Sequence, residues 1–159
     1  MGKHLLIIGL LFFQFAVAQS KGVQKEAKRV VKLLEANKQD WISGAPGGGA
    51  GTNYSIKLQI LTDKKIEFKN LWLGAENVSF QVASYSADVN KKVQAGDSVE
   101  ISYNQVSNPN KKQDAKNDSN SKRPPLDYKG VALVEYIIGG SARYYVIKSF
   151  KQVVAVNGQ

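Results

Sequence analysis

The clearest pattern of hydrophobic positions lies between residues 130 and 156, where two apolar runs flank Gly139-Gly140. Glycine tolerates the positive φ of a tight hairpin turn, and the apolar runs provide the two paired strands. The first run is apolar on both faces, which indicates a strand near the middle of a packed sheet. A turn centred on the two glycines places Glu135 opposite Tyr144 and beside Arg143.

Strict alternation of apolar and polar residues begins near Thr52, where one face carries Tyr54, Ile56, Leu58 and Ile60. This period of two is typical of a half-buried antiparallel strand. Similar segments follow over residues 65–73, 77–85 and 99–103, and a slip in phase near Asn70 indicates a β-bulge. We therefore predict an all-β domain of seven or eight strands, an antiparallel immunoglobulin-like β-sandwich, with a small barrel as the alternative.

Three other segments depart from this alternation. Apolar residues recur at helical spacing over residues 23–38, which predicts a short N-terminal helix. Residues 44–51 are rich in glycine but lack the Lys-Ser/Thr pair of a phosphate-binding loop, so we expect a connection. Residues 105–126 are polar and end in Pro124-Pro125. We predict a mobile loop there, because the segment has little apolar surface to bury.

The first twenty residues, MGKHLLIIGLLFFQFAVAQS, have the pattern of a secretory signal peptide. A basic residue precedes a short apolar run that ends in small residues, so we expect cleavage after Ala18. This divides the chain into a signal peptide (1–18), a helical segment (19–38) and a sandwich domain (39–159). We expect no integral membrane segment after cleavage. The chain contains no cysteine, which excludes lipid attachment at a cleavage-site cysteine and any disulfide.

Three short stretches resemble small secreted β-sandwich proteins of Bacteroidota. They are the Ala18-Gln19 junction, the GAGTNY sequence of residues 49–54 and the AGDSVEI turn of residues 95–101. The resemblance implies a protein exported to the periplasm or outside the cell, and it brings no known catalytic residues with it.

Candidate chemistry is limited because the one histidine, His4, lies in the predicted signal peptide. The remaining chain lacks the histidine and cysteine needed for Ser-His-Asp or Cys-His catalysis and for zinc, copper or haem ligation. We predict a protein that is not an enzyme and has no metal or cofactor. The alternative is a carboxylate-dependent glycan-active enzyme, for which Glu67, Glu100 and Glu135 are the candidate acids. For Glu135, which has apolar neighbours, we favour a structural ion pair with Arg143.

The net charge of +9 comes from scattered lysines rather than from an arginine-rich stripe. A basic protein that binds anionic glycan or nucleic acid is therefore a further alternative, and nucleic acid is the less favoured of the two partners. Among the aromatic residues, Trp72 and Tyr145 are the predicted binding residues because their strand neighbours point the other way. We predict an exported non-catalytic binding or structural module that contacts a polymer or protein partner of the cell envelope.

Overall fold

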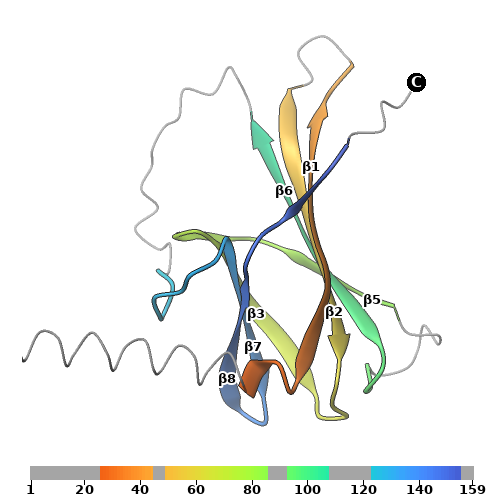
Figure 1. Cartoon of the computed structure of the whole chain (residues 1–159), viewed down its shortest axis with the longest axis vertical. Coiled ribbons are helices and arrows are strands. Elements are labelled where there is room, and N and C mark those ends of the chain that lie inside the picture. The colour runs from red at the N-terminus through yellow and green to blue at the C-terminus, as the bar shows by residue number, and fades with distance from the viewer. Residues whose placement is uncertain (1–25, 45–48, 86–92, 108–122, 155–159) are drawn as a thin grey trace, which may run out of the picture.

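The computed structural model describes residues 26–44, 49–85, 93–107 and 123–154 (Figure 1). Within these ranges the chain is helical only at Glu26 and Ala27. The strands of the described residues are β1 (Val31–Ile42), β2 (Ala50–Ile60), β3 (Ile66–Leu73), β4 (Glu76–Val78), β5 (Gln81–Tyr85), β6 (Ser98–Ser107), β7 (Ala132–Ile138), β8 (Ser141–Ile147) and β9 (Lys151–Val153). The expectation of an all-β fold is confirmed.

The described strands form two sheets that lie as separate layers in Figure 1. Sheet A has the order β5-β6-β2-β1-β9, and sheet B has the order β4-β3-β7-β8. Neighbouring strands are antiparallel except β1 and β9, which pair in parallel through three residues of each strand. This arrangement is consistent with the expected β-sandwich.

The hydrophobic core lies between the two sheets and is built from the inward side of each alternating strand. Ile56, Leu58 and Ile60 of β2 are at most 1% exposed, as the period-two pattern predicted. Opposite them, the ring of Tyr136 in β7 packs against Phe68 in β3 with centroids 6.1 Å apart. No polar or charged side chain is fully buried among the described residues, so burial of apolar surface is the main stabilising term.

The β7–β8 hairpin has the turn and the register that the sequence predicted. Gly139 and Gly140 have φ angles of 56° and 77°, a conformation that residues with a Cβ adopt at a cost. Glu135 lies opposite Tyr144. The predicted bulge in β3 is also present, since the register with β7 shifts between Phe68 and Asn70.

The predicted helix over residues 23–38 is wrong from residue 28 onward, because residues 28–30 form a turn and Val31 begins β1. Pairing with β2 along the strand overrides the local helical pattern. A register shift between Leu33 and Glu35 explains that pattern: it separates the inward positions Leu33 and Ala36 by three residues, which imitates helical spacing. The boundary expected between residues 38 and 39 falls inside β1, and residues 23–25 lie outside the described ranges.

Other segment predictions fall wholly or partly outside the described residues. The predicted signal peptide lies outside them, as do residues 108–122 of the predicted loop. The loop begins later than expected, because β6 continues to Ser107 and pairs with β2 over its last residues. In the part of the chain that the structure describes, no helix has the length and apolar character needed to cross a membrane.

Candidate binding face

Figure 1 shows the ends of β1, β2 and β6 running past the ends of β3, β7 and β8. We call this part of sheet A the extension, made of residues Lys38–Ile42, Ala50–Tyr54 and Tyr103–Ser107. Its backbone pairing is continuous out to Ile42 opposite Ala50 and Ala50 opposite Ser107. The extension therefore presents side chains of the outer face of sheet A on a regular, paired scaffold.

Trp41 is held across the outer face of the extension by Gly51 and Asn104. It lies opposite Gly51 in the β1–β2 register. A Cβ built on Gly51 would be 2.7 Å from Cζ2 of the indole, so the ring lies over the backbone of β2. The indole Nε1–H donates a hydrogen bond of 3.2 Å to Asn104 Oδ1 on β6. The ring thus spans β2 in one orientation and keeps part of its surface exposed.

The rows of outer-face residues next to Trp41 carry amide and hydroxyl side chains. The strand registers define a first row of Gln39, Asn53 and Asn104 and a second row of Asn37, Ser55 and Ser102. Asn53 and Asn104 are exposed, and the other members are part-exposed. Some of these groups already bond within the protein: Ser55 donates to Glu100, Asn37 donates to Glu35, and Asn104 accepts from the Trp41 indole. Beyond these bonds an amide has a further N–H and a hydroxyl has two lone pairs. This face therefore has the groups needed to bind a ligand rich in hydroxyls.

The inner face of the extension is stiffened by its own contacts. Tyr54 stacks on Tyr103 of the neighbouring strand, with ring centroids 6.0 Å apart. The carboxylate of Asp40 accepts hydrogen bonds from Thr52 Oγ1 at 2.7 Å and from Gln152 Nε2 at 3.0 Å, and so joins β1 to β2 and β9. Burial, with smaller contributions from nearby groups, raises the pKa of Tyr103. These contacts hold the scaffold beneath the Trp41 face.

The prediction that Trp72 and Tyr145 are exposed binding residues is wrong. Trp72 is 2% exposed and Tyr145 is 6% exposed. Tyr145 lies opposite Val134 and faces the core between the sheets, so its phase on β8 is the reverse of the expected one. Trp72 does point away from Leu71, but it lies in β3 between β4 and β7, opposite Leu133, which is also fully buried. Neither ring has a face free to stack on a sugar.

The predicted ion pair between Glu135 and Arg143 does not form. Glu135 Oε1 accepts a hydrogen bond of 3.0 Å from the Tyr144 hydroxyl, and Oε2 accepts one from Asn70 Nδ2. Arg143 instead lies opposite Tyr136, and its Nε is 3.4 Å from Glu26 Oε2. The reason is alternation: consecutive residues of a strand point to opposite faces, so an arginine beside Tyr144 projects away from Glu135.

The three candidate acids do not share one face. Glu100 lies on the outer face of sheet A, where it accepts a hydrogen bond of 2.5 Å from Ser55 Oγ. Glu67 and Glu135 belong to sheet B, and Glu67 pairs with Lys69, which lowers the pKa of Glu67. Glu100 therefore cannot face either of the other two across a cleft. Among the described residues no group of three acidic, histidine or cysteine side chains is placed to hold a metal ion.

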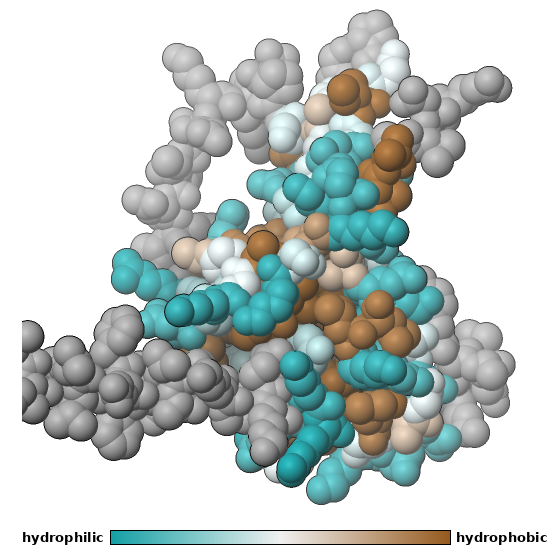
Figure 2. Space-filling view, in the orientation of Figure 1, coloured by the Kyte–Doolittle hydropathy of each residue, from teal (hydrophilic) through white to brown (hydrophobic). Residues whose placement is uncertain are grey.

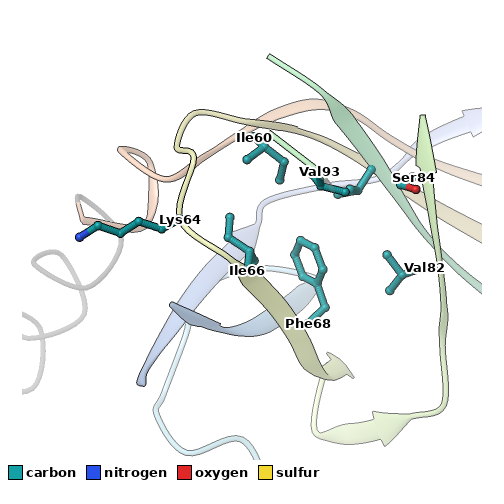
Figure 3. A pocket seen from close by; sticks show the side chains of 8 residues that line it. Ile60, Lys64, Ile66, Phe68, Val82, Ser84 and Val93 are labelled. Carbon is teal, nitrogen blue, oxygen red and sulfur yellow. The ribbon is translucent and has the colours of Figure 1, made fainter. Parts of the chain in front are cut away.

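A cavity of about 190 Å³ lies between the sheets near the β2–β3 turn (Figure 3). The residues that line it are Ile60, Lys64, Ile66, Phe68, Val82, Ser84, Val93 and Val99. Only Lys64 and Ser84 of this set are polar, and Figure 3 shows the ammonium group of Lys64 pointing away from the other lining side chains. The cavity has room for a small apolar group, and it lacks the convergent polar groups of a catalytic pocket.

Comparisons with protein-family models, curated proteins and solved structures give no match for this chain. The candidate face therefore rests on its own geometry.

Sequence reasoning did not select Trp41, although a signal for it is present in the partner strand. Glycine in the interior of a strand often marks a site where another group approaches the backbone closely. Gly51 is buried and is the second residue of β2, although its glycine-rich surroundings in the sequence led us to expect a connection up to residue 51. Its position directly across from an aromatic residue becomes apparent only once residues 31–42 are recognised as one strand.

Proposed function

We propose that this protein is an exported, non-catalytic binding module of the cell envelope that holds a glycan against the outer face of sheet A. The observation that carries the proposal is the Trp41 indole, fixed over Gly51 by its hydrogen bond to Asn104 and bordered by rows of amide and hydroxyl groups. Export is supported by the pattern of residues 1–18, and the final location is the periplasm or the outside of the cell.

The chemistry of the face suits a sugar. An aromatic face carries negative charge density, which attracts the polarised C–H bonds along one side of a sugar ring. The neighbouring amides can donate to and accept from the ring hydroxyls. Because Trp41 is already held in one orientation, binding loses little side-chain entropy, and more of the contact energy appears as affinity.

The strand order supports an immunoglobulin-like assignment for the domain. In sheet A, the order β1-β2-β6-β5 corresponds to strands A, B, E and D of that fold. In sheet B, the order β4-β3-β7-β8 corresponds to an additional C′ strand followed by C, F and G. The parallel strand β9 is an addition at the edge of β1. The resemblance to small secreted proteins of Bacteroidota is in keeping with this assignment.

The proposal is tested by affinity electrophoresis of residues 19–159 in gels containing soluble polysaccharides. We expect at least one polysaccharide to retard the protein and Trp41→Ala to lose about tenfold in affinity, or about 1.4 kcal/mol. Asn53→Ala removes an exposed amide of the first row and should weaken binding without affecting the fold. Tyr144→Phe, on sheet B, is the matched control that should bind as the unaltered protein does. Retardation that Trp41→Ala and Asn53→Ala leave unchanged contradicts the proposal.

A protein partner is the second candidate, because hydrophobic side chains are exposed near the same extension. Ile42 is 85% exposed, Val106 is 60% exposed and Val154 is 83% exposed. Figure 2 shows brown hydrophobic side chains at this end of the molecule, next to hydrophilic ones. If envelope proteins rather than polysaccharides are captured, and if Ile42→Ser abolishes capture while Trp41→Ala does not, the second candidate replaces the first.

A further inference from the structure

The described side chains of the two outer-face rows nearest Trp41 carry no charge, although the whole chain carries a net charge of +9. The row that contains Trp41 continues through Gly51 to Val106, and the next row contains Gln39, Asn53 and Asn104. At the edge of sheet A this second row is extended by Val153 of β9. None of these described side chains is ionisable. The lysines that the structure describes lie outside these two rows.

Charged side chains on this face lie beyond the two rows nearest the indole or at their edge, and both signs are present. Lys151 lies at the edge of the row of Asn37 and Ser55, the following row contains Glu35, Lys57 and Glu100, and the row after that contains Lys32. These three lysines and two glutamates leave a single formal positive charge spread over three rows. Glu100 is held by Ser55, and Glu35 accepts a hydrogen bond of 3.3 Å from Asn37. Among the described residues, this face offers no cluster of cations for an anionic ligand.

We infer that the ligand of the Trp41 face is an uncharged glycan, one without carboxylate, sulfate or phosphate groups. The inference rests on the proposed function and adds the class of substrate. An anionic sugar gains affinity from arginine or lysine donors, whose hydrogen bonds to an anion are stronger than those of neutral groups. Beside Trp41 such a sugar would lose water around its charge without gaining a cationic partner among the described residues, which is unfavourable. A neutral hydroxyl finds both donors and acceptors there.

The size of the neutral area indicates a chain of sugars rather than a single ring. Along β2 it extends from Gly51 to Ser55, a length of about 13 Å at the usual rise of a strand. Trp41 lies at one end of this length, and the amides and hydroxyls occupy the rest. One ring on the indole thus leaves room for neighbouring rings of the same chain to contact the two polar rows.

The test is titration calorimetry of residues 19–159 with two matched sets of soluble polysaccharides, one neutral and one bearing uronate or sulfate groups. Each titration is run at ~0.1 M and at ~1 M salt, because exposed charge–charge attraction is largely screened at the higher concentration. We expect binding to a neutral polysaccharide that changes less than twofold with salt. Asn104→Ala and Trp41→Ala should each weaken it about tenfold, whereas Lys69→Gln, on sheet B, should leave it unchanged.

Three results would overturn part or all of this account. If the protein binds only the acidic polysaccharides, and this binding is lost at high salt, the inference of an uncharged ligand is wrong. If Trp41→Ala also abolishes that binding, the Trp41 face is still supported as the binding site. If the protein binds a neutral polysaccharide and Trp41→Ala does not change the affinity, the ligand is uncharged as inferred but does not bind at the Trp41 face. If no polysaccharide of either set binds the folded protein, both the inference and the proposed function fail.

Discussion

The indole of Trp41 occupies the space that a side chain at position 51 would need. A Cβ on Gly51 would lie 2.7 Å from Cζ2 and 2.8 Å from Cε2 of the ring, and 2.3 Å from the carbonyl oxygen of Gln105. Contacts this short do not occur between a real Cβ and its neighbours, so the ring and the backbone would have to move apart. The orientation of Trp41 therefore depends on the glycine opposite it.

Gly51→Ala should destabilise the protein and displace Trp41. Overpacking of a close contact costs about 1–3 kcal/mol, and here one of the clashing groups is backbone that cannot move aside easily. Urea unfolding followed by circular dichroism measures the change in the free energy of unfolding. Gly44→Ala is the control, because a Cβ there meets nothing within 4 Å and the residue has no positive φ. Equal stability of the two variants would show that the ring does not lie against Gly51.

Glu135 should be energetically coupled to Tyr144 and not to Arg143. Its carboxylate accepts the tyrosine hydroxyl at 3.0 Å, whereas the arginine projects from the opposite face of sheet B. Double-mutant cycles with Glu135→Gln, Tyr144→Phe and Arg143→Gln measure both couplings from unfolding free energies. We expect about 1 kcal/mol for the tyrosine pair and less than about 0.3 kcal/mol for the arginine pair. A larger coupling energy for the arginine pair than for the tyrosine pair would instead support the ion pair that the sequence predicted.

The pKa of Tyr144 should fall when Glu135 is replaced. Burial is the largest cause that raises the pKa of this phenol, and the hydrogen bond to Glu135 and its charge add to it. In Glu135→Gln the negative charge is lost and burial remains, so the pKa should decrease and stay above its ordinary value. Titration of the tyrosine ring signals by NMR measures the change. The same titration of Glu67→Gln, another glutamate of sheet B, should leave Tyr144 unaffected.

Stability should decline at alkaline pH because of Tyr136. Burial raises the pKa of this phenol well above its ordinary value of 10.0, and its hydroxyl donates to the carbonyl oxygen of Ala27 at 3.3 Å. Below about pH 10 the phenol is protonated in both the folded and the unfolded chain, so its contribution is independent of pH. Above that pH the unfolded chain releases the proton first, and the free energy of unfolding falls as pH rises toward the folded pKa. Urea unfolding between about pH 8 and 11 should show this decline, and Tyr136→Phe should reduce its slope. An unchanged slope in Tyr136→Phe would assign the decline to other groups.

Parts of the fold that depend on local pattern were predictable from the sequence. The glycine pair set the turn of the β7–β8 hairpin and hence the pairing of Glu135 with Tyr144. Alternation along β2 identified its buried side, and the slip near Asn70 located the bulge in β3. In each case neighbouring residues carry the information, because turn geometry and side-chain phase are local properties of a strand.

Parts that depend on long-range pairing were not predictable in this way. The bulge in β1 gave residues 31–36 the spacing of a helix, and only pairing with β2 favours the strand. Trp72 points away from Leu71, as its place in the alternation predicted, and is nevertheless buried. The alternation tells which way a side chain points, but it does not tell whether other residues cover that side chain. The position of Trp41 over Gly51 requires the register of two strands separated by residues 43–49. Arg143 forms an ion pair with Glu26, a residue far from it in the sequence.

The most direct measurement uses the two tryptophans of the chain, Trp41 and Trp72. Each gives a separate indole N–H signal in a ¹H–¹⁵N NMR spectrum, and the spectrum of Trp41→Phe assigns them. Addition of a polysaccharide that binds the protein should shift the Trp41 signal progressively, because the sugar stacks on that ring beside its hydrogen bond to Asn104. The Trp72 signal, from a ring that is 2% exposed in sheet B, should remain in place. Saturable binding that leaves the Trp41 signal unmoved would contradict the account.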